Sequence, residues 1–180
     1  ECSGALIAQN LVLTAAHCLD EAAGPQHVAV FFFDGAKAVP PFAKVAAIHR
    51  HPDYVRGWSK KAGDIETRQA EISADIAVLR LAAPAPAGRA PVGFDPAAKP
   101  DVLTLSAAGK AGTAGKSGTL KSANLAAIRH TQTGPKLAFA TPGKGQVCTG
   151  DSGGAVALVH QLPLNRGQVS PRFPCRRPRI

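Results

Sequence analysis

The chain has 180 residues, 45% of them hydrophobic, and a formal net charge of +9; this length allows a sizeable core in one domain or in two small ones. No run approaches the roughly 20 apolar residues of a membrane-spanning helix, so no membrane partner is expected. Five of the positive charges are arginines in 162–180, which leaves +4 for the rest of the chain. Because aromatic residues are not interleaved with these arginines, nucleic-acid binding is not expected either.

The first 83 residues are dominated by patterns typical of short β-strands. Strands are predicted at 5–14, as two short segments around a turn at Gln9 and Asn10, and then at 27–33, 44–49 and 75–81. A short helical turn is predicted at 15–19, and the polar, glycine-containing segment 55–74 is predicted to be a surface loop. Residues 1–83 are therefore expected to form one β-unit.

A proline-rich segment separates this unit from a second one. Five prolines fall within 82–100, and the linker is placed at 84–100. Strands follow at 101–106, 136–140 and 155–160, with a glycine-rich turn region at 107–118 and a loop at 141–145, whereas the pattern of 120–130 fits either a strand or a helix. The fold class is therefore all-β, with a second unit at 101–160 and an atypical proline- and arginine-rich tail at 161–180, for which disorder is the simplest interpretation.

Four cysteines leave three interpretations open: buried thiols, a metal site that uses His17 beside Cys18, or disulfides. Zinc ligands usually come in pairs spaced as C-x2–4-C, and the chain has no CxxC pair, so no metal site is predicted. Disulfides formed in an oxidising compartment fit best.

Three stretches carry residue types suited to nucleophilic catalysis: LTAAHC at 13–18, DIAVL at 75–79 and CTGDSGG at 148–154. Taken singly, each has an ordinary explanation as a structural histidine, a turn or cap aspartate, and a glycine-rich turn. In this order, and together with CSGALI at 2–7, IHRHPDY at 48–54 and SGTLK at 117–121, they resemble the trypsin/chymotrypsin family of serine proteases over most of the chain. The resemblance implies two six-stranded antiparallel β-barrels, the second incomplete, of which the first carries the His and the Asp and the second the Ser.

By match of motif, the resemblance also assigns the catalytic roles. A serine hydroxyl is a poor nucleophile and needs a base, an imidazole can take and return its proton, and a carboxylate fixes the imidazole tautomer. Ser152 is the expected nucleophile, His17 the general base and acid, and Asp75 the orienting carboxylate. The other candidates, Asp53 and Asp64, lie in loop sequence that no comparable strand follows.

Further residues take implied roles from the same resemblance. Backbone N–H groups of Gly150 and Ser152 match the oxyanion hole, which stabilises the negative charge that develops on the substrate carbonyl. Asp151 matches the carboxylate that pairs with the new N-terminal amine released by zymogen cleavage. The implied disulfides are Cys2–Cys18, around the His17 turn, and Cys148–Cys175, around the substrate pocket.

The sequence also departs from the family pattern. Gln146 stands at the expected base of the specificity pocket, and its neutral amide disfavours a preference for lysine or arginine. The family's first strand would lie upstream of Glu1, and after Val159 the normal C-terminal strands and helix give way to the proline- and arginine-rich tail. The chain is therefore expected to be a fragment, and a frame error or a truncated gene product is the preferred explanation of the tail.

The leading functional hypothesis is a secreted or periplasmic, monomeric serine endopeptidase that needs no cofactor. Its expected partners are a polypeptide substrate and a proteinaceous inhibitor. Two alternatives stay open: a catalytically inactive relative that acts as a binding protein, and a cationic surface-binding protein that works through the arginine-rich tail.

Overall fold

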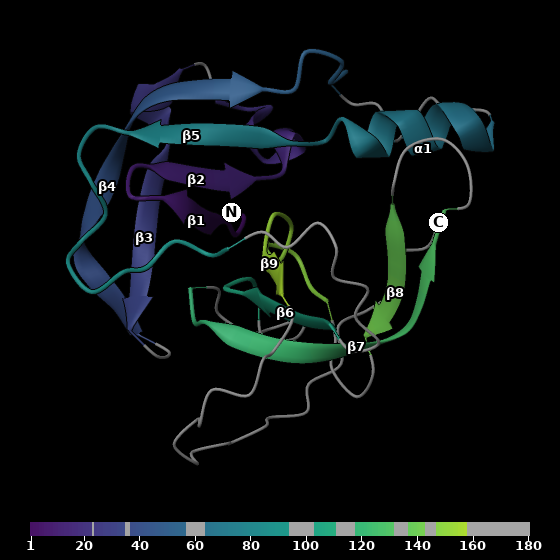
Figure 1. Ribbon diagram of the computed structural model, residues 1–180. Helices are drawn as coiled ribbons and strands as arrows, with labels where there is room; N and C mark the ends of the chain where they lie inside the picture. Colours follow the sequence, from purple (N-terminus) through teal and green to yellow (C-terminus); the bar gives the residue numbers. More distant parts are fainter. Residues whose placement is uncertain are drawn as a thin grey trace.

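The computed structural model describes residues 1–22, 24–34, 37–56, 64–93, 103–110, 118–131, 137–142 and 147–157. They form two antiparallel sheets, each curled into a half-barrel, with one α-helix beside them (Figure 1). Within these residues the first sheet has five strands and the second has four. The chain is thus mostly β, with the two-barrel organisation expected from the resemblance.

The first sheet begins with a hairpin. It contains β1 (Ala5–Ala8), β2 (Leu11–Thr14), β3 (Ala29–Asp34), β4 (Lys37–Arg50) and β5 (Ala77–Leu81), in the order β1-β2-β5-β4-β3. The predicted turn between 8 and 11 joins β1 to β2, as expected. Side chains alternate between the two faces of a strand, and in β5 the residues Ala77, Leu79 and Leu81 are buried while Arg80 is exposed. The buried face packs on Val12 of β2, among others, to form the core of this half.

The second sheet contains β6 (Leu103–Ala107), β7 (Lys121–His130), β8 (Ala138–Pro142) and β9 (Ala155–Ala157), in the order β8-β7-β6-β9. The ambiguous segment 120–130 is therefore a strand. It pairs with β6 on one side, where Leu125 lies opposite Leu103, and with β8 on the other. Pairing with strands distant in sequence decides its conformation, which a local pattern does not encode.

One helix, α1 (Ile65–Ser73), corrects the prediction of a surface loop over 55–74. Asp64 caps its N-terminus, because its carboxylate accepts a hydrogen bond of 2.7 Å from the backbone N–H of Thr67. The helical sequence is rich in good helix formers such as Glu, Arg, Gln and Ala. The polarity that suggested a loop belongs to a helix whose described side chains are exposed or half-buried.

Several strand boundaries also differ from the predictions; β5 begins at Ala77 instead of 75, and β8 extends to Pro142, into the predicted loop 141–145. His27 closes a short 3-10 turn, η2 (Pro25–His27), and β3 starts only at Ala29. In the other direction, β4 extends the predicted strand 44–49 back to Lys37, through two prolines. Those prolines, Pro40 and Pro41, fall where the β3–β4 register is irregular, so the ladder does not need the N–H groups that proline lacks.

Several predicted segments lie partly or wholly outside the described residues. These are the end of the linker (94–100), most of the glycine-rich region (111–117) and the tail (161–180). The limits of the two predicted units, 1–83 and 101–160, remain predictions. Among the described residues, no helix is both long and apolar enough to cross a bilayer.

Candidate active site

His17 lies on a 3-10 turn, η1 (Ala16–Leu19), that follows β2; we call it the His17 turn. It matches the short helical turn predicted at 15–19. Ala16 and Leu19 are 0% and 4% exposed, so they anchor the turn in the core of the first sheet. The disulfide Cys2–Cys18 ties the same turn to the start of the chain. His17 itself keeps 41% of its side chain exposed, at the surface of this anchored turn.

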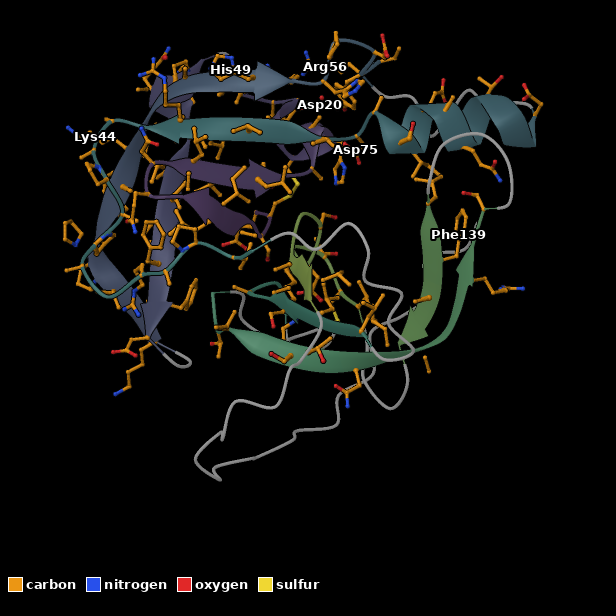
Figure 2. All side chains as sticks on the ribbon, in the orientation of Figure 1. Asp20, Lys44, His49, Arg56, Asp75 and Phe139 are labelled. Carbon is orange, nitrogen blue, oxygen red and sulfur yellow. A yellow bond between two sulfur atoms is a disulfide. The ribbon has the colours of Figure 1, made fainter. Side chains whose placement is uncertain are left out.

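Polar contacts support the far side of the His17 turn. Arg50 Nη2 donates a hydrogen bond of 2.6 Å to the carbonyl of Leu19. The Tyr54 hydroxyl donates to the carboxylate of Asp20, labelled in Figure 2, at 2.9 Å from each oxygen. Burial, followed by the hydrogen bond and the negative charge of Asp20, raises the pKa of Tyr54 well above its ordinary value. The phenol therefore stays a hydrogen-bond donor across the neutral pH range.

Asp75 holds His17 at two points. It lies between α1 and β5, where Figure 2 labels it. Its Oδ1 accepts a hydrogen bond of 2.8 Å from the backbone N–H of His17, and its Oδ2 lies 2.6 Å from Nδ1 of the ring. A carboxylate partner requires the proton to reside on Nδ1, which leaves Nε2 able to accept another. With 13% of its side chain exposed, Asp75 is largely screened from water.

The other aspartates considered from the sequence lie elsewhere. Asp53 is 83% exposed and faces His51 at 3.9 Å. Asp64 caps α1. Of the three, Asp75 is the one whose carboxylate contacts His17 in the described part of the chain.

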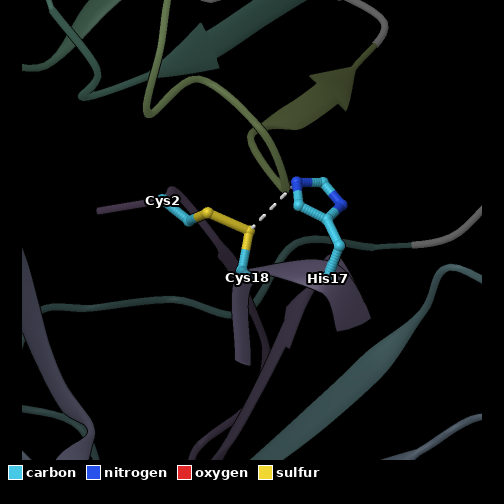
Figure 3. Close-up of side chains that lie close together, drawn as sticks. All are labelled: Cys2, His17 and Cys18. Carbon is cyan, nitrogen blue, oxygen red and sulfur yellow. Dashed lines mark hydrogen bonds between the residues drawn. A yellow bond between two sulfur atoms is a disulfide. The ribbon is translucent and has the colours of Figure 1, made fainter. Parts of the chain in front are cut away.

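His17 and two cysteine sulfurs gather closely enough to resemble a metal site. Nε2 of His17 lies 3.7 Å from Sγ of Cys18, and the ligand atoms of Cys2, His17 and Cys18 all lie within 4.8 Å of one another (Figure 3). Both sulfurs, however, are joined in the disulfide. Cysteine binds metals as thiolate, so this cluster offers no pair of sulfur ligands.

Ser152 lies on a tight turn, residues 148–154, which we call the Ser152 turn. The Asp151 N–H donates to the carbonyl of Cys148 at 3.1 Å, and the Gly154 N–H donates to the carbonyl of Asp151 at 3.0 Å. Gly150 has φ of +93°, a left-handed conformation that glycine adopts without steric cost. The turn thus bends sharply just before the half-buried Ser152.

The buried carboxylate of Asp151 stabilises the Ser152 turn through several contacts. Its side chain is only 3% exposed. The carboxylate accepts hydrogen bonds from the backbone N–H groups of Cys148 (2.8 Å) and Gly109 (3.0 Å). It also accepts from Lys121 Nζ, at 2.9 and 3.1 Å. The resemblance implies an amine released by cleavage as the partner of this carboxylate; among the described residues the cation that contacts it is Lys121.

Ser3 joins the two halves of the molecule at this site. Its N–H donates to the carbonyl of Ser152 at 2.8 Å, and its hydroxyl donates to the carbonyl of Gly150 at 2.9 Å. The same hydroxyl accepts from the N–H of Ala108, also at 2.9 Å. In Figure 3 the loop before β9 passes beside the imidazole of His17, in keeping with these contacts. Ser3 therefore places the Ser152 turn against the His17 turn.

The structure thus brings His17, Asp75 and the Ser152 turn together. Within the described part of the chain, no hydrogen bond joins Ser152 Oγ to His17. Cys148 is disulfide-bonded, whereas Gln146 and Cys175 lie outside the described residues, so the pocket position and the Cys148–Cys175 pairing remain predictions.

Sequence reasoning missed Lys121 and Ser3, although both lie inside motifs that it quoted, SGTLK and CSGALI. A signal for Lys121 existed: a buried carboxylate next to the nucleophile requires a cation. The sequence does not show which of its 21 lysines and arginines meets that carboxylate. For Ser3 there was no comparable signal.

Comparisons with known proteins agree with this geometry. A family model described as Trypsin matches residues 1–180. Among the matching solved structures is neuropsin, a serine protease expressed in the limbic system of mouse brain. It is 23% identical in sequence and has a TM-score of 0.62, and the match covers 86% of this chain and 70% of the neuropsin chain. At that identity the likeness shows a shared fold. No curated protein sequence gives a significant match.

Proposed function

Because the chain belongs to the trypsin family of serine proteases, we propose that it is an endopeptidase that works through His17, Asp75 and Ser152. One observation carries the proposal: Oδ2 of Asp75 lies 2.6 Å from Nδ1 of His17, which leaves Nε2 to act as the base for Ser152. A protease of this family acts on polypeptides, so a polypeptide is the substrate class.

The proposed chemistry follows from these protonation states. Ser152 Oγ attacks the carbonyl carbon of the scissile bond, while His17 Nε2 takes the hydroxyl proton. The tetrahedral intermediate collapses when the C–N bond breaks, and the imidazolium gives its proton to the departing amine. A water molecule then attacks the acyl-enzyme by the same route, with His17 again as base, and the acid product leaves. Asp75 stabilises the imidazolium in both halves of the reaction.

The oxyanion donors are proposed to be the backbone N–H groups of Gly150 and Ser152. A donor of this kind contributes roughly 3–4 kcal/mol to the transition state when its position is fixed in advance. The positive φ of Gly150 and the internal hydrogen bonds of the Ser152 turn fix that position before substrate arrives, which supports this assignment.

A fluorophosphonate probe, which phosphonylates activated serines with loss of fluoride, tests the proposal. The wild-type chain is expected to be labelled at Ser152, located by peptide mass mapping, and the Ser152→Ala variant is expected to remain unlabelled. The matched control is Ser73→Ala, because the Ser73 hydroxyl only bonds the carbonyl of Ala70 within α1; it should label like the wild type. A folded wild-type chain that takes no label would contradict the proposal and favour the inactive binding protein.

The setting of the enzyme is part of the proposal. Trypsin-like proteases are generally secreted, and the Cys2–Cys18 disulfide is typical of an oxidising compartment. We infer secretion or a periplasmic location, a monomeric enzyme, and a proteinaceous inhibitor as a further partner. Mass spectrometry of the purified chain under non-reducing conditions tests the second implied disulfide, Cys148–Cys175.

A further inference from the structure

We propose that Lys121 is a positioning residue for Ser152, and that it supplies from within the chain the cation on which the Ser152 turn depends. Its catalytic consequence rests on the proposed function. The contact itself does not, and the two can be tested separately.

The ammonium group of Lys121 has all its donors engaged. It lies 2.9 and 3.1 Å from the two carboxylate oxygens of Asp151, and it donates a hydrogen bond of 2.8 Å to the carbonyl of Lys110. Lys121 is the first residue of β7, so the sheet fixes where its side chain starts. The Lys121 side chain is 31% exposed and that of Asp151 is 3% exposed. The ion pair is therefore largely shielded from bulk water.

A carboxylate as buried as that of Asp151 is costly unless it is both paired and hydrogen-bonded. The N–H groups of Cys148 and Gly109 satisfy hydrogen bonds but bring no charge. Lys121 is the cation within salt-bridge distance of Asp151 in the described part of the chain. Without it, the carboxylate would carry an unpaired buried charge, which favours a swing toward water, and that movement would alter its bond to Cys148.

That bond connects Lys121 to the reacting groups. Asp151 Oδ2 holds the N–H of Cys148, and the Asp151 N–H closes the turn onto the carbonyl of Cys148. The N–H groups proposed as oxyanion donors, those of Gly150 and Ser152, lie between and beside these anchor points. A displacement of about 1 Å in such donors is enough to cost roughly a hundredfold in rate. Lys121 thus acts on catalysis through Asp151 without touching the substrate.

This arrangement differs from the one that the resemblance implies. The resemblance assigns to Asp151 a new N-terminal amine, made only when the chain is cut. In this structure Lys121 contacts both oxygens of the carboxylate. The contact that holds the Ser152 turn therefore comes from a side chain of the second sheet.

Amide hydrogen exchange of the peptides that cover 147–154 tests the contact, whatever the chemistry of Ser152. Lys121→Met keeps the side-chain stem and removes the charge, and we expect exchange there to become roughly tenfold faster, as for loss of a charge-assisted hydrogen bond. The matched control is Lys110→Met, an exposed residue whose backbone carbonyl remains available to Lys121; it should exchange like the wild type. Lys121→Arg should restore most of the protection. Unchanged exchange in a folded Lys121→Met variant would overturn the proposal.

Fluorophosphonate labelling of the same proteins tests the catalytic consequence. Lys121→Met should label about 10- to 1,000-fold more slowly, the range expected for misplaced oxyanion donors, and Lys110→Met should label normally. If exchange responds but even the wild type takes no label, the proposed function fails while the positioning role stands. If Lys121→Met labels at the wild-type rate, the positioning role is wrong.

A double variant completes the test. Should Lys121→Met fail to fold, Lys121→Met/Asp151→Asn leaves no unpaired buried charge and should fold. Slow labelling by that double variant supports the positioning role, and wild-type labelling refutes it.

Discussion

His17 and Ser152 both lie on short turns, but the two turns are supported in different ways. Under the His17 turn lies the apolar core of the first sheet, with Leu19 and Leu79 among its buried members, and the Cys2–Cys18 disulfide joins the same turn. In the second half, the buried residues of the described ranges are the small Ala107, Gly109 and Gly150 and the polar Thr104 and Asp151. Within these ranges, hydrogen bonds and one ion pair hold the Ser152 turn.

The difference assigns different tasks to the two halves. Apolar burial is non-directional and scales with area, so it can hold the base of His17 firmly while its ring stays exposed. Hydrogen bonds are directional, and a fully satisfied buried network specifies a single arrangement. Such a network suits the Ser152 turn, where N–H groups must point at a developing charge. Within the described residues, the first half therefore contributes apolar packing, and the network around the Ser152 turn contributes geometry.

Replacing Asp75 should have the largest effect, because it should slow labelling of Ser152 without changing hydrogen exchange of the Ser152 turn. Asp75→Asn keeps the shape of the side chain but no longer requires the proton of His17 on Nδ1, so Nε2 loses its role as base. We expect the labelling rate to fall by about 10,000-fold, as for this replacement in the well-studied triad of related proteases, with hydrogen exchange at 147–154 unchanged. Asp151→Asn, by contrast, should change that exchange. Equal exchange effects of the two variants would contradict the division of tasks.

Truncations in the two sheets test where stability resides. Leu79, 4% exposed, lies in the core of the first half, and Leu79→Ala should lower the free energy of unfolding by about 2–5 kcal/mol. Leu105 of β6 is only half-buried, and Leu105→Ala should cost less than about 2 kcal/mol because fewer contacts are lost. Urea denaturation followed by circular dichroism measures both. A larger loss at Leu105 would show that the second half is the better packed one.

The sequence predicted the surroundings of the His17 turn better than the contacts of the Ser152 turn. Strand alternation located β5, and motif wording located His17, Asp75 and the Cys2–Cys18 bridge, because these signals are local in the chain. The contacts of the Ser152 turn with Ser3 and Lys121 depend on which distant segments meet, 149 and 31 residues from Ser152 in the sequence. The local polarity of 65–73 led to a wrong prediction, because a polar helix and a loop share a similar composition.

The disulfide should contribute to stability without shaping the Ser152 turn. Cys2 and Cys18 are 16 residues apart, and closing a loop of that length is worth about 3 kcal/mol in the chain-entropy model. The paired variant Cys2→Ser/Cys18→Ser should lose about that much stability in urea denaturation. Its exchange at 147–154 should stay close to that of the wild type, and a selective rise there would mean that the bridge also positions Ser152.

Ser3→Ala tests the link between the halves. The variant loses the hydroxyl that donates to Gly150 and accepts from Ala108, and leaving such part-buried groups unpaired should cost about 1–3 kcal/mol. The backbone bond from residue 3 to Ser152 remains. Ser73→Ala, at the end of α1, is the matched control and should stay within about 0.5 kcal/mol of the wild type. A loss no larger than that of the control would show that Ser3 is not a structural link.

Tyr54→Phe should have the smallest effect and a distinctive pH dependence. The phenol donates to Asp20, and removing this bond should cost about 1–2 kcal/mol at neutral pH. The pKa of Tyr54 is raised in the folded state, first by burial, so its contribution is fully present below the unfolded pKa of about 10 and is lost as pH rises through the folded pKa. The stability difference between wild type and variant, from urea denaturation, should therefore be constant from about pH 7 to 9 and shrink above about pH 10. A difference that grows above that pH would mean that the ionised phenolate is favoured by folding, which the Asp20 carboxylate beside it opposes.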